Sequence, residues 1–111
     1  MKRKLTEMAD VIRSKNSGPY ELTLDVLFKT EDDFETARKY RVLSPEKICE
    51  LYKITPEKII GIVEFPPAKA IKVTIQRPTC SGDSGETDVY GAQQHAPLLG
   101  IEFDTDSPIP A

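Results

Sequence analysis

The sequence predicts a single α+β domain with a mainly antiparallel sheet of three to four strands and helices on one face. The chain has 111 residues, which is enough for one modest hydrophobic core but too few for two. Segments that alternate apolar and polar residues, typical of half-buried strands, are interspersed with segments that open on helix-capping residues. We therefore expect one domain over residues 1–111, with residues 104–111 forming a frayed tail.

The first elements are expected to be a helix, a turn and a strand. Apolar residues at positions 5, 8, 9 and 12 have helical spacing, so a short amphipathic helix is predicted over residues 5–12. The Asn-Ser-Gly-Pro run at positions 16–19 then favours a tight polar turn. Residues 22–28 are rich in β-favouring side chains and predict a strand that places Thr23 and Asp25 on the same face.

Two helices are predicted from their N-terminal signals. Thr30 precedes three acidic residues, which the helix dipole favours in a first turn, and this helix is expected to run to about Tyr40. Ser44 followed by a proline predicts a second helix that ends near Lys53. A third capped start at residues 55–58 is expected to form a single short turn.

The second half of the chain is predicted to supply the remaining strands. The apolar run at residues 59–65 indicates a central strand, and the alternating residues 68–75 indicate a half-buried antiparallel strand. Periodicity is lost over residues 79–95, and a loop of that length in a compact domain is usually functional or disordered. Residues 98–103 are predicted to form a last short strand.

Composition excludes several classes of partner. The net charge is −3 and the basic residues are scattered, so no nucleic-acid partner is expected. No apolar run has the length of a signal peptide or a membrane span, so we expect a soluble protein with no membrane partner. Cys49 and Cys80 form no CxxC pair, which suggests neither a disulfide framework nor a zinc site and fits a reducing cytoplasm. No cofactor is expected. Cys49 is expected to be a small buried apolar residue.

The first of two unusual polar segments runs from Arg13 to Asp25. Arg13, Ser14, Lys15 and Asn16 begin the predicted turn, and such a turn can hold a carboxylate or phosphate, with arginine as a fork and lysine as a point charge. The alternative is that the cations only complement the end of the preceding helix. A carboxylate inside a strand needs water or a partner, so Asp25 is either a salt-bridge partner of Arg13 or Lys15, or a site residue.

The second polar segment, residues 82–98, contains His95, the only histidine of the chain. It could act as an acid or base near neutral pH, with Asp88 or Glu86 orienting it. The alternative is a solvated loop with a hydrogen-bonded histidine. The spacing of these residues matches no metal motif. Further substrate-binding candidates in the segment are Tyr90, Gln93 and Gln94.

Residues 11–25 and 87–98 closely resemble the bacterial family known as domain of unknown function 4387, and the resemblance covers almost the whole chain. Members of that family resemble the small C-terminal domain of acyclic terpene utilisation (AtuA-type) proteins and are typically encoded beside a separate AtuA-like large protein. Those domains carry an Arg-Ser-Gly-Asp-Lys-Gly-type turn, of which only Arg13, Ser14 and the general turn carry over. The resemblance implies a ferredoxin-like α+β fold and a catabolic setting with carboxylic or CoA-linked acids.

Our leading hypothesis is therefore the small subunit of a two-component catabolic enzyme, a hydratase or lyase acting on an organic acid or its CoA thioester with an AtuA-like large protein. Arg13 and Lys15 would hold an anionic group, while Asp25, Asp88 and His95 would position or transfer protons. The alternative is a non-catalytic interaction module that stabilises or regulates its partner. Homo-oligomerisation is compatible with both, and an independent small enzyme is disfavoured because a domain of this size has little room for a deep pocket.

Overall fold

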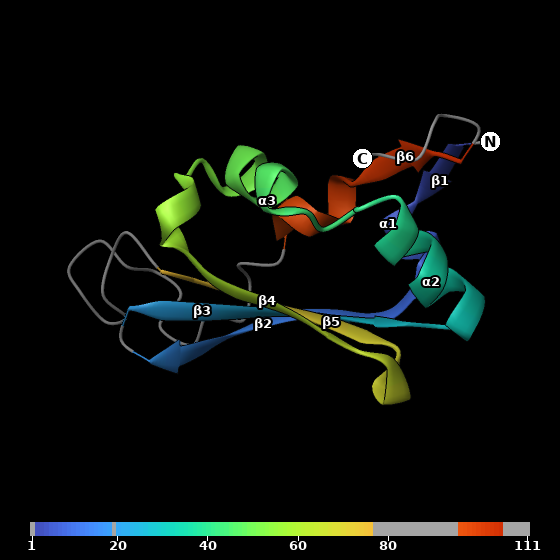
Figure 1. Ribbon diagram of the computed structural model, residues 1–111, viewed down its shortest axis with the longest axis horizontal. Helices are drawn as coiled ribbons and strands as arrows, with labels where there is room; N and C mark the ends of the chain where they lie inside the picture. The colour runs from blue at the N-terminus through green and yellow to red at the C-terminus, as the bar shows by residue number, and fades with distance from the viewer. Residues whose placement is uncertain (1, 19, 77–95, 106–111) are drawn as a thin grey trace.

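A four-stranded antiparallel sheet with strand order β2-β3-β5-β4 carries the helices on one of its faces (Figure 1). The strands are β2 (Ala9–Gly18), β3 (Glu21–Phe28), β4 (Ile59–Phe65) and β5 (Ala70–Gln76). This computed structural model describes residues 2–18, 20–76 and 96–105. The predicted α+β class, with helices on one face of an antiparallel sheet, is confirmed.

Two helices connect the two strand pairs. The first, α2 (Glu31–Lys39), is capped by Thr30, whose hydroxyl accepts a hydrogen bond from the Asp33 backbone N–H at 3.1 Å. The second, α3 (Pro45–Tyr52), is capped in the same way by Ser44. Both caps and both helices are confirmed, as is the single turn η1 (Pro56–Lys58) that follows.

The order of elements does not confirm a ferredoxin-like arrangement. A ferredoxin-like domain alternates strands and helices as β-α-β-β-α-β. Here β2 pairs with β3, β4 pairs with β5, and α2 and α3 follow one another between these two pairs. The central contact of the sheet is made by β3 and β5, which are also antiparallel.

A second, two-stranded sheet joins the two ends of the described chain on the helix side (Figure 1). In it β1 (Lys2–Lys4) pairs with β6 (Glu102–Asp104), so that Lys2 lies opposite Asp104. The short helix α1 (Leu5–Met8) follows β1, and η3 (Ala96–Gly100) precedes β6. The Leu5 N–H donates to the Ile101 carbonyl at 3.0 Å, which extends this junction.

The hydrophobic core lies between the helix-bearing face of the large sheet and the elements above it. The rings of Phe28 in β3 and Phe34 in α2 meet edge to face at a centroid separation of 6.1 Å, a favoured aromatic geometry. The buried apolar side chains come from β3 and β5, from α1 and α3, and from η3 and the residue before β6. They include Leu5, Met8, Leu22, Leu24, Val26, Ile48, Ile71, Val73, Ile75, Leu98 and Ile101. A short turn, η2 (Pro66–Ala68), connects β4 to β5.

The largest correction concerns the N-terminal segment. The predicted helix ends at Met8, and the chain from Ala9 is a strand. The predicted polar turn over residues 16–19 is replaced, as far as Gly18, by the continuation of that strand. Pairing with β3 explains the difference. It hydrogen-bonds the backbone of β2 to a second strand and packs Ile12, opposite Val26, against the core, whereas a short isolated helix is only marginally stable in water.

Three further predictions change. The strand at residues 59–65 is an edge strand rather than a central one, and Ile60, Val63 and Phe65 are each more than half exposed. The final apolar segment forms η3 before a three-residue strand, instead of one strand over residues 98–103. Cys49 is half-buried rather than buried. The predicted loop at residues 79–95 and the tail beyond residue 105 lie outside the described residues.

Candidate functional site

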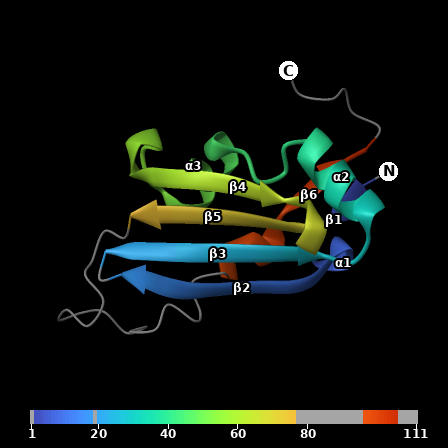
Figure 2. The ribbon, with the colours of Figure 1, turned by 60° about the horizontal axis from the view of Figure 1, so that its bottom comes forward.

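The candidate site lies on the face of the large sheet that points away from the helices, which we call the outer face. Figure 2 shows the four strands side by side from that direction. Within the described part of the chain, no α-helix covers this face (Figure 1). Because side chains of a strand alternate between its two faces, every second residue of each strand contributes to it.

Strand register aligns four outer-face residues in one row across the sheet. Arg13 of β2 lies opposite Asp25 of β3, Asp25 opposite Lys72 of β5, and Lys72 opposite Val63 of β4. A neighbouring row is apolar and consists of Val11, Leu27, Ala70 and Phe65. The charged row and the apolar row therefore run in parallel across the sheet, and they are two residues apart along each strand.

Asp25 is the central group of the charged row. Its Oδ2 lies 3.2 Å from Nε of Arg13, and its side chain is only 8% exposed although none of the described α-helices lies over it. Thr23, which lies on the same face of β3, is buried as well. From the sequence, Asp25 was expected to be either a salt-bridge partner of Arg13 or Lys15, or a site residue. The salt bridge to Arg13 is present.

Residues of both rows other than Val11, together with Lys15 and Ala68, line a depression of about 460 Å³. Among the described residues that line it, the cationic side chains are Arg13, Lys15 and Lys72, and the one carboxylate is Asp25. The rest of the lining is apolar and consists of Leu27, Val63, Phe65, Ala68 and Ala70. Val63 and Phe65 remain 58% and 57% exposed, which is unusual for large apolar side chains that lie next to each other on one face.

This arrangement suits an anion attached to an apolar body. A guanidinium carries five N–H donors, and the contact with Asp25 uses Nε, so Arg13 retains donors for an incoming carboxylate or phosphate. The ammonium groups of Lys15 and Lys72 add positive charge beside it. The apolar row offers a contact surface for the remainder of the ligand.

The structure separates the predicted anion-binding residues into two pairs. Arg13 and Lys15 share the outer face, whereas Ser14 and Asn16 point to the helix-bearing side because they occupy the alternate positions of the same strand. Ser14 is buried there. A convergence of all four residues, expected for a turn, does not occur in a strand.

Residues 82–95 of the second polar segment lie outside the described residues. They include Asp88, His95 and the other candidates Tyr90, Gln93 and Gln94. Their meeting with Arg13 and Asp25 therefore stays a prediction. Among the residues that the structure does describe, no group of three or more His, Cys, Asp or Glu side chains could hold a metal ion.

Lys72, Val63 and Phe65 were missed by sequence reasoning. Alternation over residues 68–75 was visible in the sequence and already placed Lys72 on a polar face. What the sequence does not contain is the register that puts Lys72 next to Asp25. The sequence placed Val63 and Phe65 in a central strand, where large apolar side chains are expected to be buried, so their exposure was not predicted.

A known protein family matches most of the chain. A family model described as "Domain of unknown function (DUF4387)" matches residues 5–102, which is most of the chain. No curated protein and no solved structure matches it. Over the ranges that the structure describes, none of the helices has the length and apolar character needed to cross a membrane.

Proposed function

The chain belongs to the DUF4387 family, and on that premise we propose that it is the small subunit or accessory domain of a two-component catabolic enzyme. The proposed reaction class is a hydratase or lyase acting on an organic acid or its CoA thioester. The proposed partner is an AtuA-like large protein, and the proposed compartment is the cytoplasm.

The observation that carries this proposal is the combination of charge and exposure on the outer face. Arg13, Lys15 and Lys72 gather beside a surface on which Val63 and Phe65 are exposed. A substrate pocket normally buries most of its ligand. A depression in an open sheet buries less, so a second protein that covers the outer face would complete the enclosure.

In this proposal the two rows have different tasks. The cations of the charged row hold the anionic group of the substrate, and Asp25, with Asp88 and His95, positions or transfers protons. The exposed side chains of Val63 and Phe65 contact the large protein, since burying a large apolar side chain contributes about 1.5–3 kcal/mol. The substrate would then lie at the boundary between the two proteins.

A second candidate function is an interaction module that contributes no reacting group. The ion pair between buried Asp25 and exposed Arg13 favours it, because a carboxylate that already has a cationic partner has a structural role without any substrate. Under this alternative the entire outer face is a docking surface, and its cations meet acidic groups of the partner.

Purification of the protein from its native host, followed by substitution of outer-face residues, tests the proposal. We expect an AtuA-like protein to co-purify. Lys15→Ala with Lys72→Ala should lower the turnover of the complex roughly 10- to 100-fold without releasing the partner, because each cation makes a charge-assisted contact with the substrate. Lys29→Ala with Lys39→Ala removes two exposed cations elsewhere and should leave turnover unchanged.

Two other variants separate the enzyme from the module. Val63→Asp with Phe65→Asp should release the partner under either function. His95→Ala and Asp88→Asn should abolish turnover with the complex intact if the chain contributes reacting groups, and should leave turnover unchanged if it does not. A protein that purifies from its host without any partner contradicts both functions.

A further inference from the structure

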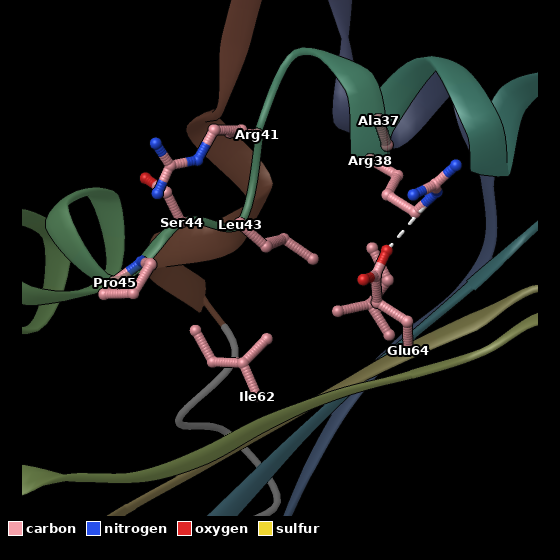
Figure 3. Close-up of a pocket in the computed structure, with 9 residues that line it drawn as sticks. Ala37, Arg38, Arg41, Leu43, Ser44, Pro45, Ile62 and Glu64 are labelled. Atoms are coloured by element: carbon pink, nitrogen blue, oxygen red, sulfur yellow. Dashed lines mark ion pairs between the residues drawn. The ribbon is translucent and has the colours of Figure 1, made fainter. Parts of the chain in front are cut away.

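A second pocket lies on the opposite side of the sheet, where the connection between α2 and α3 passes over β4 (Figure 3). Its volume is about 310 Å³. Leu43 and Ile62 point into it from above and below, and Ile71 and Ala37 complete its apolar lining. None of the described residues that line it also lines the depression on the outer face.

Two guanidinium groups flank the apolar part of this pocket. Figure 3 shows Arg41 beside Ser44 and Pro45 on one side, and Arg38 beside Glu64 on the other. Arg38 lies between two carboxylates, 2.8 Å from Glu35 and 3.5 Å from Glu64. Arg41 lies 3.6 Å from Glu46, whose side chain is 77% exposed.

Arg41 occupies a backbone position that does not suit an arginine. Its φ is 52°, in the left-handed region, immediately after the last turn of α2. The Val42 N–H donates to the Ala37 carbonyl and the Arg41 N–H to the Arg38 carbonyl, which is the Schellman pattern that glycine usually completes. The chain thus places a long cationic side chain at the pocket, at a position where glycine would be unstrained.

We propose that this pocket binds a small carboxylate with a compact apolar body. The carboxylate is held by the guanidinium of Arg41, which matches its planar, two-oxygen geometry. The apolar body lies against Leu43 and Ile62, and the ion pair with Glu64 fixes Arg38 as the far wall. This site is independent of the proposed function, because it lies on the other side of the sheet.

The exposed carboxylate of Glu46 competes with the ligand for Arg41. An ion pair that is long and solvated contributes little, so a ligand carboxylate that is partly enclosed can replace it. Removing the charge of Glu46 should therefore strengthen binding. Glu64 should not compete, since Arg38 engages it.

Titration of the isotope-labelled full chain with hexanoate, followed by amide chemical shifts, tests this site. We expect saturable shifts at Ala37, Leu43 and Ile62, and much weaker shifts with hexanamide, which has the same body but no charge. Glu46→Gln should bind hexanoate roughly twofold to fivefold more tightly.

Arg41→Gly is the decisive variant, because it removes the guanidinium and relieves the backbone strain at once. It should keep or raise the midpoint of thermal unfolding and weaken hexanoate binding by at least about tenfold. Lys53→Gly is the matched control. Lys53 has a φ of 56° at the end of α3 and does not line the pocket, so this variant should become more stable with unchanged hexanoate binding.

Three results would overturn the inference. One is equal binding of hexanoate by Arg41→Gly and the unsubstituted chain. Another is equal binding of hexanamide and hexanoate. The third is an absence of shifts at the α2–α3 connection, including the case in which hexanoate shifts only outer-face residues such as Lys72, a result that leaves the proposed function standing.

Discussion

Arg13 and Asp25 form a cross-strand ion pair whose members differ widely in exposure. Nε of Arg13 lies 3.2 Å from Oδ2 of Asp25, and the two side chains are 60% and 8% exposed. The carboxylate is thus removed from water while its partner remains accessible from the outer face. A buried carboxylate depends on its partner more than an exposed guanidinium does.

This asymmetry predicts the effect of breaking the pair. Arg13→Met should lower the free energy of unfolding by about 1–3 kcal/mol, because Asp25 keeps its charge and loses its hydrogen-bonding partner. Arg13→Met combined with Asp25→Leu should recover most of that loss, since the buried charge is gone. Urea denaturation of the single and double variants measures both values, and a double variant no more stable than Arg13→Met would contradict the prediction.

The cap of α2 predicts a second loss of stability. Thr30→Ala removes the hydroxyl that accepts from the Asp33 N–H and should cost about 1 kcal/mol, while Thr30→Ser should retain most of the cap. Thr55 precedes η1 without a side-chain hydrogen bond to a backbone N–H of that turn. Thr55→Ala is therefore the matched control, and a loss equal to that of Thr30→Ala would show that threonine removal rather than capping is responsible.

Two adjacent leucines in η3 should respond very differently to truncation. Leu98 is fully buried in the core, so Leu98→Ala should cost about 2–5 kcal/mol through lost burial and the cavity left behind. Leu99 is 46% exposed, and Leu99→Ala should change stability by less than about 0.5 kcal/mol. Chemical denaturation gives both values. Similar losses for the two variants would mean that η3 does not dock on the core as described.

Burial of Tyr52 predicts a pH dependence of stability at alkaline pH. Burial raises the pKa of the Tyr52 hydroxyl above its usual value, because it disfavours the phenolate. The unfolded chain therefore releases this proton at a lower pH than the folded chain, so the stabilising contribution is complete below the ordinary tyrosine pKa and is lost as pH rises above it.

Tyr52→Phe should consequently lose less stability than the unsubstituted protein between about pH 9 and pH 11, a range around the ordinary tyrosine pKa. The difference between the two urea-denaturation series isolates Tyr52 from the lysines and other tyrosines, which titrate in both proteins. Parallel pH profiles would contradict the assignment.

The helices could be predicted because their signals are local. The capping bonds of Thr30 and Ser44 each span three residues, and both helices begin where these residues predict. The strand β2 could not be predicted in the same way. Its apolar spacing fits a helix as far as Ile12, and the competing strand depends on pairing with residues of β3 that the local pattern does not reveal.

The candidate site likewise combines one contact that the sequence suggested with others that depend on the pairing of distant strands. The pairing of Asp25 with Arg13 was one of the sequence-based alternatives, because both residues belong to neighbouring segments. Lys72 and Val63 join them only through the β3–β5 and β5–β4 registers, which bring together distant parts of the chain. The exposure of Val63 also depends on β4 lying at the sheet edge, and an apolar run does not distinguish an edge strand from a central one.

Strand β3 divides its residues between two tasks. Leu22, Leu24 and Val26 pack in the core, while Thr23 and Asp25, between them, face the other way. Substitutions at alternate positions therefore have different consequences: one set changes the packing of the core, and the other changes what the outer face meets. The ligand or partner can change through positions 15, 63 and 72 while the packed side chains and the Arg13–Asp25 pair stay untouched, so recognition and folding can evolve separately on the same strands.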